Sequence, residues 1–171
     1  MIGVDIFISC GDEVATYRDV GQAVFRSLEH MFRNELEVPL AIANWDFRAD
    51  APRVVRAGDL AARSLAMVER SNALIAIFGA DLPKITCKEI RRAFSLRQRG
   101  SPVDIWVFLD RGHRSRRHAE FVARIKRQFH EEIIFTLYES ELDFQAKLFT
   151  TLTPYLFRRF MQAPVVLGET A

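Results

Sequence analysis

The chain is poor in cysteine and has no pattern that would bind a metal. Among 171 residues there are two cysteines, Cys10 and Cys87. They do not form a CxxC pair, and no cluster of cysteine and histidine has the spacing of zinc ligands. The sequence therefore predicts two reduced thiols, as in cytosolic proteins, and neither a disulfide framework nor a structural metal.

Long hydrophobic runs and a large net charge are also lacking. No stretch approaches the roughly 20 apolar residues of a membrane span. The first residues, MIGVDIFISC, do not join a charged segment to a long apolar run, so no signal peptide is expected. The net charge is only +2, from 24 basic and 22 acidic residues. This balance gives no overall case for nucleic acid or a membrane as partner, and we expect a cytoplasmic protein.

Several motifs of known enzymes are absent. Neither phosphate-cradling loop occurs: there is no GxGxxG after the first expected strand and no GxxxxGK[ST]. There is no GxSxG and no HExxH. Arg18 stands eight residues after Cys10, a spacing too long for the tight thiolate loop of a phosphatase. The four histidines are scattered, which favours surface or boundary positions over ligand roles.

Short apolar runs alternate with longer segments of helical period. Strands are expected at 4–9, 38–43, 73–79, 104–109 and 132–138. Helices are expected at 17–36, 60–71, 84 to about 100, 115–129 and 140–160. Residues 44–59 are predicted to form a long loop. Asp59 and Ser140 are the expected N-caps of their helices, and Pro154 is expected to kink the last helix.

This alternation predicts an α/β fold with a parallel sheet covered on both faces. Five such strands suggest a flavodoxin-like, three-layer fold with strand order 2-1-3-4-5. Ligands of such sheets bind beyond the carboxyl ends of the strands, where the order reverses between strands 1 and 3. We therefore expect a site in the loops that follow Ser9 and Phe78. One domain is predicted over 1–160, with a tail at 161–171.

The segment KITCKEIRRAF (84–94) places one glutamate, Glu89, among four bases near the start of a helix. On a helical wheel Glu89 lies beside the buried stripe of Ile90, Ala93 and Phe94, and it shares a face with Thr86. Two interpretations are open: a solvated charge paired with Arg92 at i+3, or a catalytic carboxylate at the ligand edge.

Other candidate substrate-binding residues follow the first two strands. Ser9 and Cys10 end the first strand, although Cys10 also suits a small core position. Asp12 is able to accept hydrogen bonds from a ribose or to cap the first helix. After the second strand, Trp45 and Phe47 flank Asp46, and an aromatic ring there would either stack on a base or close the core. The basic segment DRGHRSRRH (110–118) is either a solvated loop or a contact for an anion or partner.

Three stretches carry a resemblance to a known family. DIFISCGDE, AGDLAARSLAMVERSNALIAIFGADLP and TCKEIRRAFSLRQRGSPVDIWVF occur in the order and spacing of TIR domains. The resemblance covers about residues 4–109. The strongest pieces are DIFIS and CKEI. This chain departs from the family at Cys10 and Gly11, where TIR enzymes often carry a basic or aromatic residue.

The resemblance implies one of two functions. Some TIR domains are adaptor modules that only assemble with one another. Others cleave the nicotinamide–ribose bond of NAD+ with a glutamate in the helix after the third strand, which is Glu89 here, and many bacterial members act in defence against phage. The resemblance thus implies NAD+ as substrate rather than cofactor, self-association, and ADP-ribose or a cyclic product. A nucleoside deoxyribosyltransferase on a similar sheet is a third alternative.

One carboxylate is chemically sufficient for that cleavage. Glycosidases usually need a second carboxyl group to protonate a poor leaving group. Nicotinamide leaves a cationic pyridinium as a neutral base, so it needs no general acid. A fixed carboxylate then stabilises the positive charge that develops on the ribose.

Overall fold

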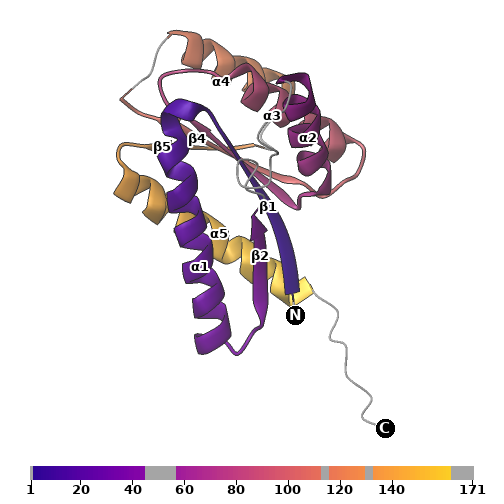
Figure 1. Ribbon diagram of the computed structural model, residues 1–171, viewed down its shortest axis with the longest axis vertical. Helices are drawn as coiled ribbons and strands as arrows, with labels where there is room; N and C mark the ends of the chain where they lie inside the picture. The colour runs from indigo at the N-terminus through magenta and orange to yellow at the C-terminus, as the bar shows by residue number, and fades with distance from the viewer. Residues whose placement is uncertain (1, 45–56, 113–115, 130–132, 163–171) are drawn as a thin grey trace.

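The computed structural model describes residues 2–44, 57–112, 116–129 and 133–162. These residues form a five-stranded parallel sheet in the order β2-β1-β3-β4-β5, with helices on both faces (Figure 1). The predicted fold class and strand order are confirmed.

Each predicted strand and helix is present, with bounds that differ by a few residues. The strands are β1 (Ile2–Cys10), β2 (Leu40–Asn44), β3 (Ala73–Phe78), β4 (Asp104–Asp110) and β5 (Ile134–Tyr138). The helices are α1 (Ala15–Glu35), α2 (Ala57–Arg70), α3 (Lys84–Gln98), α4 (Arg116–Phe129) and α5 (Glu141–Gln162). A short 3₁₀ helix, η1 (Asp12–Val14), precedes α1. Because α5 ends at Gln162, the helix extends slightly into the predicted tail.

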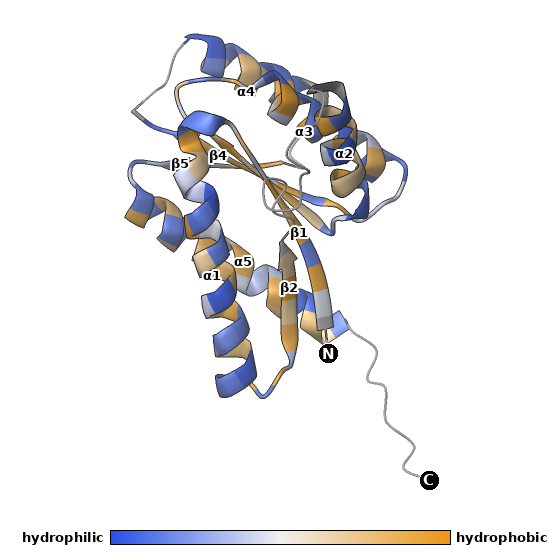
Figure 2. Cartoon of the chain, in the orientation of Figure 1, coloured by the Kyte–Doolittle hydropathy of each residue, from blue (hydrophilic) through white to orange (hydrophobic). Residues whose placement is uncertain are grey.

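The sheet separates two apolar layers. Helices α1 and α5 pack on one face, and α2, α3 and α4 on the other (Figure 1). Alternate residues of each strand point to opposite faces, so Ile6 and Ile8 of β1 contact the first layer and Phe7 the second. All six residues of β3 are buried, as expected for a strand covered on both sides. The apolar colour in Figure 2 follows the strands and the inner faces of the helices.

Helix ends agree with only part of the prediction. The Ser140 hydroxyl accepts a hydrogen bond from the backbone N–H of Asp143 at 3.2 Å, which confirms the cap of α5. The predicted cap at Asp59 is wrong, because α2 already begins at Ala57 and Asp59 lies in its first turn. Capping of α1 by Asp12 is also wrong: Val14 occupies the N-cap position, without a side-chain cap. The helix α5 continues past Pro154.

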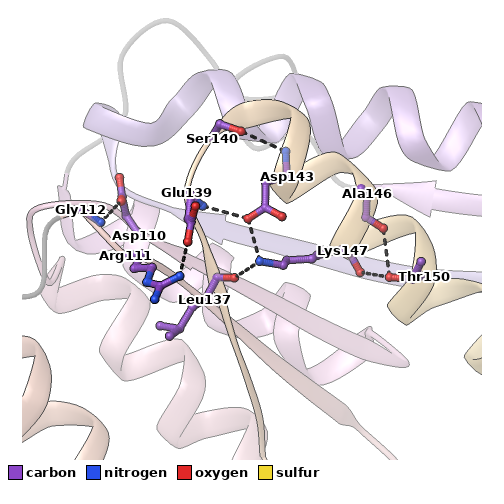
Figure 3. Close-up of polar contacts among 10 residues, drawn as sticks. All are labelled: Asp110, Arg111, Gly112, Leu137, Glu139, Ser140, Asp143, Ala146, Lys147 and Thr150. Atoms are coloured by element: carbon purple, nitrogen blue, oxygen red, sulfur yellow. Dashed lines mark hydrogen bonds and ion pairs between the residues drawn. The ribbon is translucent and has the colours of Figure 1, made fainter.

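Polar contacts fix the connection from β5 to α5 (Figure 3). Lys147 donates to the carbonyl of Leu137 and to the carboxylate of Asp143, each at 2.7 Å. Asp143 also accepts from the backbone N–H of Glu139 at 2.9 Å. Arg111, just after β4, pairs with Glu139. These contacts hold the ends of β4 and β5 and the start of α5 together.

Part of the predicted long loop, and with it Trp45, Asp46 and Phe47, lies outside the described residues. The structure does not test these three candidates. In the described part of the chain, every helix falls short of the length or apolar character that crossing a lipid bilayer requires.

Tyr138, at the end of β5, makes a testable contribution to the sheet. Its buried hydroxyl donates to the carbonyl of Phe78, at the end of β3, at 3.0 Å. Tyr138→Phe should lower the free energy of unfolding by about 1–2 kcal/mol, because it leaves a buried carbonyl without its partner. Urea unfolding measures this change. A loss no larger than that of Thr150→Ala, which removes a hydroxyl from an exposed position on α5, would contradict the assignment.

Candidate functional site

Ser9 and Glu89 meet at the carboxyl edge of the sheet. Ser9 is the next residue after Phe7 on the same side of β1, so its side chain points toward the layer that contains α3. Its hydroxyl donates a hydrogen bond to the Glu89 carboxylate. Ser9 and Glu89 are each only 3% exposed. A carboxyl group so deeply buried is uncommon in proteins unless it is partnered.

The interpretation of Glu89 as a solvated partner of Arg92 is wrong. Arg92 instead binds Glu69 of α2, with 2.8 Å between Nε and Oε1. Glu89 turns inward because α3 packs against α2 as well as against the sheet, so a residue beside the apolar stripe becomes buried. The residue predicted as a boundary position is thus an interior one.

Burial is the main influence on the ionisation of Glu89. It raises the pKa of the carboxyl group above the ordinary glutamate value. Hydrogen bonds from Ser9 and Ser64, and then the positive charge of Arg18, offset part of that rise. The Ser64 hydroxyl also lies 3.0 Å from the carbonyl of Ala61, and its single proton serves one acceptor at a time. The site thus holds a carboxylate that is easily protonated but is surrounded by groups that favour its charged form.

Thr86, one turn before Glu89 on α3, is fully buried. Its hydroxyl has no hydrogen-bond partner among the residues that the structure describes. A buried hydroxyl without a partner is energetically costly. Thr86 and Glu89 are both buried, in agreement with the prediction that they share one face of the helix.

Cys10 points to the opposite face of β1 from Ser9 and packs beside the α1–α5 layer. The Arg18 side chain donates to its sulfur at 3.2 Å. The sequence spacing was judged too long for the thiolate loop of a phosphatase. The short helix η1 and the first turn of α1 nevertheless bring Arg18 back to the end of β1.

A cleft of about 1150 Å³ lies at the predicted ligand edge. Its loop end is formed by residues 10–13 after β1 and residues 80–83 after β3, and α3 and α4 form its walls. The cleft thus lies where the strand order predicts a ligand site. Asp12 lines this cleft, whereas Ser9 and Glu89 are not among its lining residues.

Most of the α3 residues that line the cleft lie on a different flank of the helix from Glu89, the exception being Ile85, one turn before it. Cys87 and Arg91, which line the cleft, stand roughly 160–200° around the helix from Glu89. The flank that carries Glu89 faces β1 and α2, and the flank that carries Cys87 and Arg91 faces α4. Burial raises the pKa of the Cys87 thiol, while the charges of Arg91 and Arg124 of α4 lower it in part.

Two close approaches fix the loops at this edge. A Cβ atom on Gly11 would lie 2.6 Å from Cγ of Pro83, so only glycine fits there without a shift. The Glu13 carboxylate accepts a hydrogen bond from the backbone N–H of Asp81 at 2.8 Å. These contacts hold the start of α3, and hence Glu89, against the end of β1.

Sequence reasoning missed three residues near these sites. Ser64 is buried beside Glu89, and Arg18 acts on both Glu89 and Cys10. His118 was expected at the surface or a boundary, but it is 4% exposed and lines the cleft. Only the apolar spacing of α2 and α4 hinted at the burial of Ser64 and His118. Within the described ranges, no group of three or more potential ligand residues could hold a metal ion.

Neither a family model nor the sequence of a curated protein matches this chain. Solved structures with a similar chain trace include a CMP N-glycosidase from Clostridium botulinum, with a TM-score of 0.47 and 12% identity over 84% of this chain and 97% of that one. An FMN-dependent NADH-azoreductase from Bacillus anthracis has a TM-score of 0.48 and 8% identity, covering 92% and 99% of the two chains. Flavodoxin 1 from Bacillus cereus has a TM-score of 0.42 and 12% identity, covering 91% and 97%. At this level of similarity, the neighbours do not identify a reaction.

The raised pKa of Glu89 predicts how stability depends on pH. At a pH between the pKa of Glu89 in the unfolded chain and its higher pKa in the folded protein, the folded state binds one more proton. Protonated Glu89 therefore favours the folded state at low pH, and this contribution to the free energy of unfolding is lost as pH rises through the folded pKa. Glu89→Gln removes this loss of stability, because glutamine stays uncharged at every pH in this range. The variant should therefore melt at a higher temperature than the wild type at neutral pH, and the difference should shrink toward pH 4.

Thermal melts across this pH range measure the effect. Glu69→Gln is the matched control, because Glu69 is an exposed carboxylate of α2 that pairs with Arg92 of α3. A surface pair of this kind contributes only about 0–1 kcal/mol. If the melting temperatures of the two variants depended on pH in the same way, burial would not govern the ionisation of Glu89.

Proposed function

We propose that this chain cleaves the bond between nicotinamide and ribose in NAD+, with Glu89 as the catalytic carboxylate. The observation that supports the proposal is the burial of Glu89 against Ser9, at the sheet edge where α/β folds bind ligands. A pKa raised by burial in such a place is a common property of catalytic groups. The match of the sequence to the TIR enzyme pattern at DIFIS and CKEI gives the substrate.

In the proposed reaction the carbon–nitrogen bond breaks, and its electron pair leaves with neutral nicotinamide. The ribose carbon becomes oxocarbenium-like, and the Glu89 carboxylate stabilises this positive charge. Attack by water gives ADP-ribose and releases one proton. Attack by an adenine nitrogen of the same molecule would give a cyclic product instead, and the shape of the occupied pocket decides between them.

This role requires both ionisation and access. The Ser9 and Ser64 hydroxyls and the Arg18 charge favour the carboxylate form against the effect of burial. Because Glu89 is 3% exposed, binding of the substrate has to uncover it. We propose that self-association in the cytoplasm assists this step, so that the rate per subunit rises with protein concentration. A rate per subunit independent of concentration would contradict it.

The near-complete burial of Glu89 also favours a second function. In an interaction module of TIR type, the Ser9–Glu89 contact would serve only to join β1 to α3. Such a module would keep its fold and its self-association without consuming NAD+.

Nicotinamide release by the concentrated protein separates these functions. Glu89→Gln should lower the rate by roughly 10²–10³-fold, because it removes a preorganised charge from the transition state. Glu69→Gln should retain the wild-type rate. Equal rates for wild type and Glu89→Gln would refute the catalytic role. Turnover of nucleosides without turnover of NAD+ would favour the deoxyribosyltransferase alternative.

Ser9 offers a second test through the pH dependence of the rate. Its hydrogen bond lowers the pKa of Glu89, so Ser9→Ala should raise that pKa. The acidic limb of the pH–rate profile should then move to higher pH, because Glu89 has to be ionised to act. A uniform loss of rate with no movement of that limb would mean that Ser9 is only structural.

A further inference from the structure

The cleft between α3 and α4 has an unusual distribution of charge. Six basic side chains line its walls: Lys84, Lys88 and Arg91 from α3, and Arg117, Arg124 and Arg127 from α4. All six are exposed. None forms an ion pair with a carboxylate in the described parts of the chain, whereas their neighbours Arg92 and Arg116 do.

The spacing along each helix explains this arrangement. Lys84, Lys88 and Arg91 recur at intervals of four and three residues, so they share one face of α3. Arg117 and Arg124 are seven residues apart and share one face of α4. Arg91 of α3 and Arg124 of α4 line the same cleft, together with Cys87. Two rows of like charge across one hollow repel each other unless an anion lies between them.

The loop end of the cleft has the opposite character. The carboxylates of Asp12 and Asp81 line it, beside the partly exposed apolar side chains of Leu82 and Ile85. Carboxylates at this position are able to accept hydrogen bonds from sugar hydroxyls or from an amino group. The helices thus contribute mainly cationic side chains, with one carboxylate, Glu120, that pairs with Arg116, and the loops contribute hydrogen-bond acceptors.

We propose that this cleft binds a nucleoside polyphosphate, with the phosphates between Arg91 and Arg124 and the nucleoside toward Asp12 and Asp81. Guanidinium groups match the geometry of phosphate oxygens. The volume of about 1150 Å³ lies just above the roughly 300–1,000 Å³ of ordinary small-molecule pockets, so a nucleotide has room there. The acidic loop end disfavours a nucleic-acid strand, which would carry phosphates along the whole cleft. The site is separate from Glu89, which lies on the other flank of α3, and it does not rest on the proposed cleavage.

Calorimetric titration with ADP tests the site, because ADP contains no nicotinamide bond. The wild type should bind ADP more tightly than pyrophosphate, and adenosine should not bind measurably. Arg91→Gln with Arg124→Gln should weaken ADP binding by at least roughly tenfold for each lost guanidinium contact. Arg63→Gln with Arg70→Gln, two exposed positions on α2, should leave it unchanged.

The folding of both double variants is checked by circular dichroism and thermal melts. If the Arg91 and Arg124 variant is misfolded, the corresponding Arg→Lys pair, which keeps the charges but loses the forked geometry, replaces it and should still bind ADP more weakly than the wild type. Equal loss of affinity in the α2 control would mean that general charge attraction is sufficient, and it would overturn the site. Binding of a poly-glutamate peptide in preference to ADP would overturn it in favour of an acidic protein partner.

Discussion

The hydrogen bond between Ser9 and Glu89 is the contact on which the arrangement of the site depends. It joins the end of β1 to the first turns of α3, two elements that lie 80 residues apart in the sequence. Burial makes the bond necessary, because an unpartnered carboxyl group at 3% exposure would be strongly destabilising. The same burial raises the pKa of Glu89, so the packing of α3 determines both where the carboxyl group lies and how readily it ionises.

That contact is possible because the surrounding structure brings the two elements together. The parallel sheet places the ends of β1 and β3 side by side, and the close approach of Gly11 to Pro83 fixes the loop that leads into α3. On one flank of α3 lies the buried carboxylate, and on the other lies a cleft rich in exposed cations. A single helix thus separates a site suited to stabilising positive charge from one suited to binding negative charge.

The fold could be predicted from sequence because strand and helix periods are local signals. The apolar run 73–78 and the stripe of Ile90, Ala93 and Phe94 identify the central strand and the inner face of α3. Strand order predicted the edge of the sheet at which the cleft lies. The resemblance singled out Glu89, whose catalytic role stays a prediction. A helical wheel of α3 could not show that Glu89 is buried, because the burial comes in part from α2, whose Ser64 lies beside Glu89 but 25 residues earlier in the chain. For the same reason spacing did not reveal Ser64, or the contact of Arg18 with Cys10.

The proposed function requires the buried carboxyl group of Glu89 to respond to NAD+. Carbon-13 nuclear magnetic resonance of glutamate side chains, followed across pH with and without NAD+, measures this most directly. We expect the pKa of Glu89 to lie above the ordinary glutamate value, and NAD+ to move the Glu89 signal while leaving that of the exposed Glu69 in place. A Glu89 signal that titrates at the ordinary glutamate value and does not move when NAD+ is added would contradict this expectation.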